Sequence, residues 1–119
     1  MRHALIIESN VLVAMMIEDE LVERGYDSVE IASFQEQAIQ MATAHCPDLI
    51  TADDNLDAGS GVEAIREICR DQAIPVIFVT ADPGTIKKCI PDAIIVPKPF
   101  SREQLIAAIE DAVYLPTVS

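Results

Sequence analysis

Polar residues able to bind a cation or contact an anion follow four of the apolar segments of this chain. Glu8 follows the first segment, Asp53 the third, Thr80 the fourth and Lys98 the last. Carboxylate oxygens are the ligands that Mg²⁺ prefers, and a lysine adds a compact positive charge. Each residue alone is as easily a turn cap or a surface charge. Two acids, a hydroxyl and a lysine at successive segment ends instead indicate a site for chemistry on an anionic substrate.

These residues come together only if the segments before them lie in one sheet. Short apolar runs predict buried strands, and longer stretches with apolar residues every three or four positions predict helices. The predicted strands are 4–7, 28–32, 48–53, 75–80 and 93–96, and the predicted helices are 10–24, 34–45, 61–70 and one after Ser101. Gly25 suits the position past a helix end, and Gln104 completes a capping box with Ser101.

The alternation of strands and helices predicts an α/β fold. We expect a flavodoxin-like, doubly wound five-stranded parallel sheet with the strand order 2-1-3-4-5. In such a sheet the carboxyl ends of all strands meet at one edge, and ligands bind there at the switch point between the first and third strands. The four polar residues are therefore expected to converge at this edge.

Length and composition limit the classes of function. A chain of 119 residues predicts one domain over 1–119, with a core of about 3–114 and a short C-terminal tail. The formal charge of −12 argues against nucleic-acid binding. The longest apolar run, 11–17, is too short to cross a membrane, and three widely spaced cysteines are typical of reduced thiols in a cytoplasmic protein. His3 and His45 lack metal-ligand spacing, and neither resembles a phosphodonor histidine.

The chain resembles, over essentially its whole length, the response-regulator receiver domain of two-component signalling, the single-domain, CheY-like family. The resemblance is carried by Glu8, Asp53 with Asn55 two positions on, Thr80-Ala81, Lys98-Pro99-Phe100 and the helical segment GSGVEAIREI. It implies a phosphoprotein of signal transduction rather than an enzyme, with self-phosphorylation and autodephosphorylation as its only reactions.

The resemblance also implies a role for each residue at the strand ends. Asp53 is implied as the phosphoacceptor, Lys98 as a contact for the phosphoryl group, and Thr80 as the switch hydroxyl. Glu8, Asp53 and the backbone carbonyl of Asn55 are implied as ligands of Mg²⁺. The residue types suit this chemistry, because a carboxylate attacks a dianionic phosphoryl group only when positive charge offsets the repulsion.

The chain departs from the family pattern directly after Glu8. The family usually carries a second acid at that position, and here the residue is Ser9. Because a neutral hydroxyl is a weaker ligand, we expect Mg²⁺ binding that is weaker than at a two-acid site rather than lost. Asp54 should point to the opposite face of its strand and lie at the surface or the rim.

Further departures concern the conformational switch. Ile95 stands where the family often carries an aromatic residue, so Ile95 either couples to the switch differently or only packs in the core. Two prolines and a glycine crowd the segment 82–91, which leaves room for one or two helical turns. The fourth helix should therefore be short, irregular or mobile. Lys98–Pro99 resembles the family's cis peptide, which aims the lysine into the site.

These residues favour a phosphoacceptor receiver. Asp53 would accept a phosphoryl group from a histidine kinase or phosphotransfer protein and signal by protein–protein contact or onward phosphotransfer, since no effector domain is expected after Val113. The alternative is a degenerate receiver that binds proteins without phosphorylation, which Ser9 favours. An enzyme of the same fold fits less well, because a flavodoxin's phosphate loop is missing and Asn55 replaces the second acid of an aspartyl phosphatase.

Overall fold

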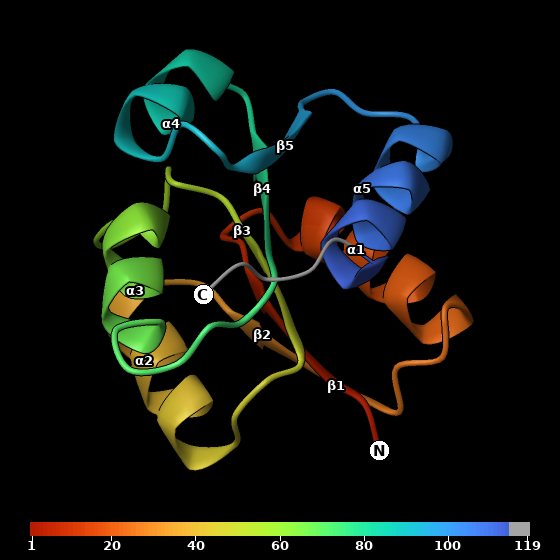
Figure 1. Cartoon of the computed structure of the whole chain (residues 1–119), viewed down its shortest axis with the longest axis horizontal. Helices are drawn as coiled ribbons and strands as arrows, with labels where there is room; N and C mark the ends of the chain where they lie inside the picture. Colours follow the sequence, from red (N-terminus) through yellow and green to blue (C-terminus); the bar gives the residue numbers. More distant parts are fainter. Residues whose placement is uncertain (115–119) are drawn as a thin grey trace.

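A computed structural model describes residues 1–114 as five strands and five helices that alternate along the chain (Figure 1). The strands are β1 (His3–Ile7), β2 (Ser28–Ala32), β3 (Leu49–Ala52), β4 (Val76–Thr80) and β5 (Ile94–Pro97). The helices are α1 (Val11–Glu23), α2 (Gln35–Ala44), α3 (Gly61–Ile68), α4 (Pro83–Cys89) and α5 (Arg102–Tyr114). The predicted tail lies outside the described residues. Among residues 1–114, no helix is long and apolar enough to cross a membrane.

All neighbouring strands pair in parallel in the order β2-β1-β3-β4-β5, which confirms the predicted flavodoxin-like topology. In Figure 1, α1 and α5 lie on one side of the sheet, and α2, α3 and α4 lie on the other. Alternate residues of β1 point to the two faces of the sheet. Ala4 and Ile6 pack on the side of α1 and α5, and Leu5 and Ile7 pack on the side of α2, α3 and α4. A strand covered on both faces must be apolar throughout, which explains the continuous run at the start of the chain.

The helix ends follow the signals expected from the sequence. Asn10 caps α1 through its side chain, which accepts hydrogen bonds from the backbone of Leu12 and Val13. Gly25 follows α1 with a φ of 98°, in the left-handed region that glycine adopts most readily. At α5, Ser101 and Gln104 form the predicted capping box, with reciprocal hydrogen bonds of 2.7 and 3.1 Å.

Helix α4 is short, as predicted, and spans seven residues. Asp82 caps it by accepting hydrogen bonds from the backbone and hydroxyl of Thr85, and Pro83 occupies its first position. The side chain of Ile86 is fully buried against the sheet. One buried side chain and one capping residue thus hold this helix, and its mobility stays a prediction.

Candidate functional site

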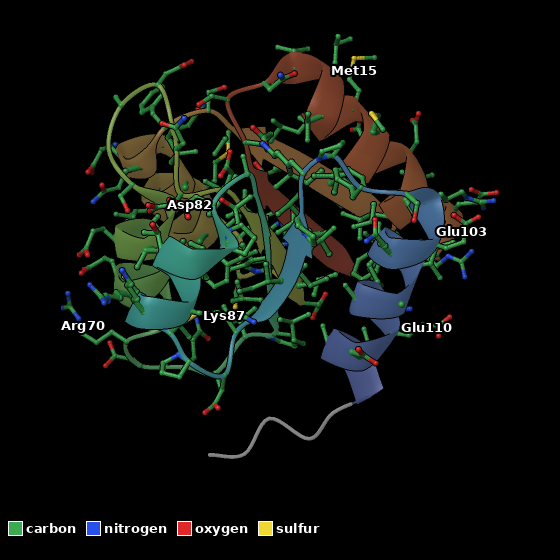
Figure 2. The ribbon with its side chains drawn as sticks, turned by 90° about the horizontal axis from the view of Figure 1, so that it is seen from above. Met15, Arg70, Asp82, Lys87, Glu103 and Glu110 are labelled. Atoms are coloured by element: carbon green, nitrogen blue, oxygen red, sulfur yellow. The ribbon has the colours of Figure 1, made fainter. Side chains whose placement is uncertain are left out.

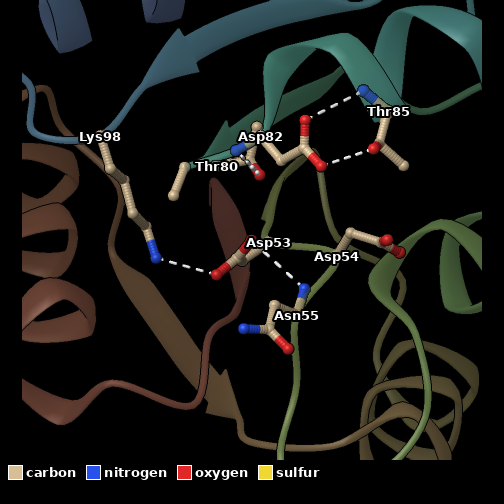
Figure 3. Close-up of a pocket in the computed structure, with 8 residues that line it drawn as sticks. Asp53, Asp54, Asn55, Thr80, Asp82, Thr85 and Lys98 are labelled. Carbon is tan, nitrogen blue, oxygen red and sulfur yellow. Dashed lines mark hydrogen bonds and ion pairs between the residues drawn. The ribbon is translucent and has the colours of Figure 1, made fainter.

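Two carboxylates and a lysine meet at the carboxyl edge of the sheet. Glu8 follows β1 and Asp53 follows β3, and these strands are neighbours in which Ile7 pairs with Ala52. The ammonium nitrogen of Lys98 lies 2.8 Å from Asp53 Oδ2 and 2.8 Å from Glu8 Oε1. Figure 3 shows Lys98 and Asp53 pointing toward one another. The parallel topology therefore brings these three predicted residues together, as expected from the sequence.

The burial of these groups makes their charges matter. Glu8 is 3% exposed and Asp53 is 6% exposed, so both carboxylates are largely removed from water. Burial lowers the pKa of Lys98, and this is the largest single effect, but Asp53 and Glu8 together raise the pKa by more. The net shift is upward, so the ammonium group stays protonated at neutral pH. One positive charge thus faces two negative charges, and the site retains a net negative charge.

Hydrogen bonds orient the carboxylates. Asp53 Oδ1 accepts a hydrogen bond of 3.3 Å from the backbone of Asn55, while Oδ2 accepts one from Lys98. Glu8 Oε2 accepts a hydrogen bond of 3.0 Å from the backbone of Asn10. Glu8 Oε1 is buried and has no hydrogen-bond partner among residues 1–114, although it is ion-paired with Lys98. This oxygen retains capacity for a cation.

A cavity of about 280 Å³ opens in front of Asp53. We call this cavity the strand-end pocket; it is lined by Asp53, Asp54, Asn55, Thr80, Ala81, Asp82, Thr85 and Lys98. Glu8 is not among the lining residues, although it is ion-paired with Lys98, which is. The pocket can admit a phosphoryl group and water, and its donors are an ammonium, hydroxyls and backbone amides.

The residues fit a hard divalent cation. Buried carboxylate oxygens with incomplete hydrogen bonding and a surplus of negative charge are the donor set that Mg²⁺ prefers. Glu8, Asp53 and the carbonyl of Asn55 are the residues that would hold such an ion. A cation at Glu8 Oε1 would share this oxygen with the Lys98 ammonium or displace it, because the two atoms lie 2.8 Å apart.

Thr80 ends β4 at the edge of the pocket. Its side chain is buried, and its Oγ1 accepts a hydrogen bond of 3.0 Å from the backbone of Asp82. The hydroxyl proton remains available to donate. The Thr80 carbonyl accepts a hydrogen bond of 2.8 Å from the Lys98 backbone, which fixes these two residues side by side.

Ser9 does not line the pocket. Its hydroxyl donates a hydrogen bond of 2.5 Å to the Ser33 carbonyl and accepts one of 2.8 Å from the Asp57 amide. These bonds tie the end of β1 to the loop after β2 and the loop after β3. The hydroxyl that stands at the family's second acid position therefore has structural partners in place of a cation.

Asp54 has a role that the sequence did not reveal. Its Oδ1 accepts hydrogen bonds from the hydroxyl of Ser60 at 2.6 Å and the backbone of Val62 at 3.2 Å. Figure 3 shows its carboxylate turned away from Lys98, in agreement with the expected orientation. Asp54 thus holds the start of α3 against the pocket rather than acting only as a rim charge.

Asp82 and Thr85 line the pocket but were absent from the sequence-based site. The signal was present, because an aspartate directly before a proline and three residues before a threonine is typical of a helix start. Hydrogen bonds from Thr85 lower the pKa of Asp82 below its usual range. Asp82 therefore stays ionised and adds a negative charge at the lip of the pocket.

Gly61 was also missed. A methyl group at this position would overlap the backbone carbonyl oxygen of Asp53. Since Gly61 is the first residue of α3, the helix can approach the carboxylate loop closely only without a side chain here. The sequence signal was the Gly-Ser-Gly segment, which indicates a turn without identifying its neighbour.

Two further positions predicted for the conformational switch, Ile95 and Pro99, lie in β5 and just after it. The Lys98–Pro99 peptide is cis, which confirms the expectation from the resemblance. Ile95 is half-buried and pairs with Phe78 of β4, against the core on the α2 and α3 side of the sheet. Its position favours the core-packing interpretation.

Comparison with known proteins agrees with this geometry. The family model "Response regulator receiver domain" matches residues 4–110. Transcriptional regulatory protein PdtaR of Mycobacterium tuberculosis (strain ATCC 25618 / H37Rv) is 34% identical over 123 residues, which cover 94% of this chain and 57% of PdtaR. Chemotaxis protein CheY of Bacillus subtilis (strain 168) is 32% identical over 111 residues, covering 88% of this chain and 92% of CheY.

A solved structure is also similar. The solution structure of the Erythrobacter litoralis PhyR receiver domain superposes with a TM-score of 0.88 at 30% identity, covering 99% of this chain and 94% of that one. The chain spans about half the length of several curated relatives, including 57% of PdtaR and 43% of PhyR from Methylorubrum extorquens (strain AM1).

Receiver domains act in two-component signal transduction, where they interact with histidine kinases, generally bind Mg²⁺ and typically serve as non-enzymatic phosphoacceptors. The matched residues include β1 from Ala4 onward, all of β2 to β5 and the whole strand-end pocket. With its parallel sheet of order 2-1-3-4-5 and with Lys98 paired to Asp53 at the carboxyl edge of that sheet, the chain belongs to the response-regulator receiver family.

Proposed function

We propose that this chain accepts a phosphoryl group on Asp53 from a phosphohistidine donor and signals through contact with another protein. The observation that carries the proposal is the placement of Asp53. Its carboxylate is buried, lines a pocket large enough for a phosphoryl group, and lies 2.8 Å from a protonated lysine. A carboxylate that only capped a turn would need neither the lysine nor the pocket.

The reaction is a transfer from nitrogen to oxygen. A carboxylate oxygen of Asp53 forms a bond to phosphorus while the bond from phosphorus to the donor's imidazole nitrogen breaks. The nitrogen keeps the electron pair of the broken bond, and the product is an aspartyl phosphate. No proton has to leave Asp53, because the attacking group is already a carboxylate.

The residues around Asp53 would position the incoming group. The Lys98 ammonium can move its hydrogen bond from Asp53 Oδ2 to a phosphoryl oxygen without leaving the pocket, since it is held between two carboxylates. The Thr80 hydroxyl lines the same pocket and can donate to a second phosphoryl oxygen. A bound Mg²⁺ would supply the additional positive charge that in-line attack on a dianion requires.

The donor's docking surface is the outer side of α1. Val11, Leu12, Met15 and Met16 are all more than half exposed and follow directly after the acid-bearing end of β1. Figure 2 shows Met15 projecting outward from α1. Several exposed apolar residues on one helix indicate a protein-binding surface, and methionines suit a helical partner because their side chains adapt in shape.

One observation favours the alternative, a degenerate receiver that binds proteins without phosphorylation. The Ser9 hydroxyl is occupied by Ser33 and Asp57, so the site has one acid fewer than the family usually provides. Weaker Mg²⁺ binding would slow phosphorylation. The retained Asp53, Lys98 and Thr80 support an active site, because protein binding alone places no demand on this combination.

Mass spectrometry separates the two functions. Acetyl phosphate with Mg²⁺ should add one phosphoryl group of about 80 Da to the native chain and none to D53N. The matched control is E103Q, which removes an exposed acid on α5 far from the pocket and should be phosphorylated like the native chain. A native chain that gains no mass, even with Mg²⁺ in the tens of millimolar, would establish the degenerate alternative.

A further inference from the structure

Two histidines and a glutamate meet at the edge of the sheet opposite the strand-end pocket. His3 begins β1, Glu30 lies in β2, and His45 follows the last residue of α2. Their potential ligand atoms all lie within 4.8 Å of one another. Because 42 positions separate the histidines in the sequence, their spacing gave no sign of this cluster, which only the fold brings together.

The topology explains why these side chains share one face. His3 pairs with Ser28, and Leu5 pairs with Glu30, so His3 and Glu30 are diagonal neighbours on the face that α2 covers. The end of α2 then places His45 over this corner, where the two imidazole rings stack with centroids 3.7 Å apart and planes inclined by 7°.

The buried imidazole is held in place by its neighbours. The His3 backbone donates a 2.7 Å hydrogen bond to Asp48 Oδ2, and its carbonyl accepts one of 2.7 Å from the Asp48 amide. In the ring, Nδ1 lies 3.0 Å from the Ser28 hydroxyl. A hydrogen bond on one ring nitrogen fixes the orientation of the other, as it does for metal-binding histidines.

The second ring nitrogen of His3 faces Glu30. His3 is 3% exposed, and its Nε2 lies 3.0 Å from Glu30 Oε1. The two atoms are ion-paired, although neither makes a hydrogen bond of regular geometry within residues 1–114. A buried imidazole nitrogen and a carboxylate oxygen this close together, with a second imidazole nearby, are donors that one divalent cation can share.

We propose that His3, Glu30 and His45 bind a divalent transition-metal ion such as Zn²⁺. Two imidazoles and one carboxylate are a common set of three protein ligands for zinc, with water in the fourth position. Nitrogen ligands select such ions over Mg²⁺, which prefers oxygen. The His45 ring must turn out of the stack to share the ion with His3, and its exposed position leaves room for that rotation.

The ion would join three elements that are far apart in the sequence: the start of β1, the middle of β2 and the end of α2. It would stabilise the folded chain, because the unfolded chain holds no preformed site. The site is independent of Asp53 phosphorylation, since it lies at the amino edge of β1 and the phosphoacceptor follows the carboxyl edge of β3.

Zinc titration of the full-length chain tests the site. The parent protein and all its variants should carry D53N, so that the carboxylates beside Lys98 do not bind the ion. We expect one equivalent of Zn²⁺ to bind by calorimetry and to raise Tm by about 10 °C at a free Zn²⁺ concentration of about one hundred times Kd. H45A and E30Q should each weaken binding at least tenfold, and both keep the buried His3 that the fold requires.

The matched control is C46S, which removes the thiol next to His45. The Cys46 sulfur lies 3.4 Å from Gln72 Oε1 and is not part of the cluster, so C46S should bind Zn²⁺ as tightly as its parent. A parent that binds no Zn²⁺ at millimolar concentration would overturn the site. So would binding that C46S abolishes, or binding that H45A and E30Q weaken less than twofold.

Discussion

The Ser9 hydroxyl accepts a hydrogen bond from the Asp57 amide at 2.8 Å, which joins the loop after β1 to the loop after β3. The same hydroxyl donates to the Ser33 carbonyl, so one small side chain connects three loops at the edge of the sheet. Ser9 stands at the position where receiver domains usually carry an acid. Ser9 therefore makes the rim of the pocket more rigid, but the cation site has one carboxylate ligand fewer.

Replacing Ser9 by aspartate should tighten Mg²⁺ binding and weaken the fold. The new carboxylate adds an oxygen ligand, which should lower the Kd for Mg²⁺ about tenfold, but it cannot donate to the Ser33 carbonyl. Loss of that hydrogen bond should cost about 1 kcal/mol of unfolding free energy without Mg²⁺. Calorimetric titration and thermal unfolding measure the two effects.

Replacing Ser9 by alanine is the matched control for that substitution. S9A loses the bond to Ser33 and the bond from Asp57 and gains no ligand. It should therefore unfold at least as easily as S9D in the absence of Mg²⁺ and bind the ion no more tightly than the native chain. Equal Mg²⁺ affinity in S9D and the native chain would contradict the idea that this position limits the cation site.

Lys98 should contribute to stability in a pH-dependent way. K98M leaves Asp53 and Glu8 buried without their cation, which should cost about 3 kcal/mol at pH 7. Because the pKa of Lys98 is raised in the folded state, its stabilising contribution is complete below the ordinary value of about 10.4. The contribution is then lost as the pH rises through the folded-state pKa.

The difference in unfolding free energy between the native chain and K98M should therefore shrink as the pH rises above about 10. Taking the difference removes the effect of Tyr26, whose pKa is raised by burial. K98R retains the positive charge and should lose less stability than K98M at pH 7. A difference that stays constant across this range would show that Lys98 acts through packing alone.

Gly61→Ala should disturb Asp53 without touching its side chain. The added methyl group would overlap the Asp53 carbonyl oxygen, so the backbone of the loop must shift. We expect a loss of about 1–3 kcal/mol in unfolding free energy and a phosphorylation rate at least tenfold lower, because misplacement of a reacting group is costly. Denaturant unfolding and the rate of labelling by acetyl phosphate measure these effects.

Gly84→Ala is the control for the Gly61 substitution. A methyl group at Gly84 would meet its nearest atom at 3.7 Å, an ordinary contact, and the residue lies inside α4. Alanine favours helix over glycine, so G84A should raise stability by about 0.5 kcal/mol. Should both substitutions have the same effect, the close approach of α3 to Asp53 would not be the cause.

Helix α4 should loosen when Asp82 loses its charge. The pKa of Asp82 is lowered by its hydrogen bonds to Thr85, so the cap stabilises α4 above the ordinary carboxylate pKa of about 3.9 and is lost as the pH falls through the folded-state value. Amide-exchange protection of residues 86–90, corrected for intrinsic rates, should fall below that pH. D82A should show the low protection already at pH 7.

D82N provides the comparison for D82A, since asparagine can cap a helix without a charge. It should keep most of the protection of residues 86–90 at pH 7 and lose its dependence on acid pH. Protection that is high and identical in all three chains would mean that the buried Ile86 alone holds α4.

Much of this fold was determined by short-range patterns in the sequence. The apolar run of β1, the glycine after α1 and the capping box of α5 each act through neighbouring residues, so their outcome does not depend on distant parts of the chain. The convergence of Asp53 and Lys98 was predictable as well, because parallel strands place all their carboxyl ends at one edge.

Only the tertiary structure decided how the side chains at the two edges of the sheet are used. Ser9 bonds loops 24 and 48 positions away, Asp54 holds the start of α3, and His45 stacks on His3. A hydroxyl, a carboxylate or an imidazole can accept many partners, and nothing local selects among them. The choice depends on which backbone groups the loops bring within about 3 Å, and that distance is set by the packing of the whole chain.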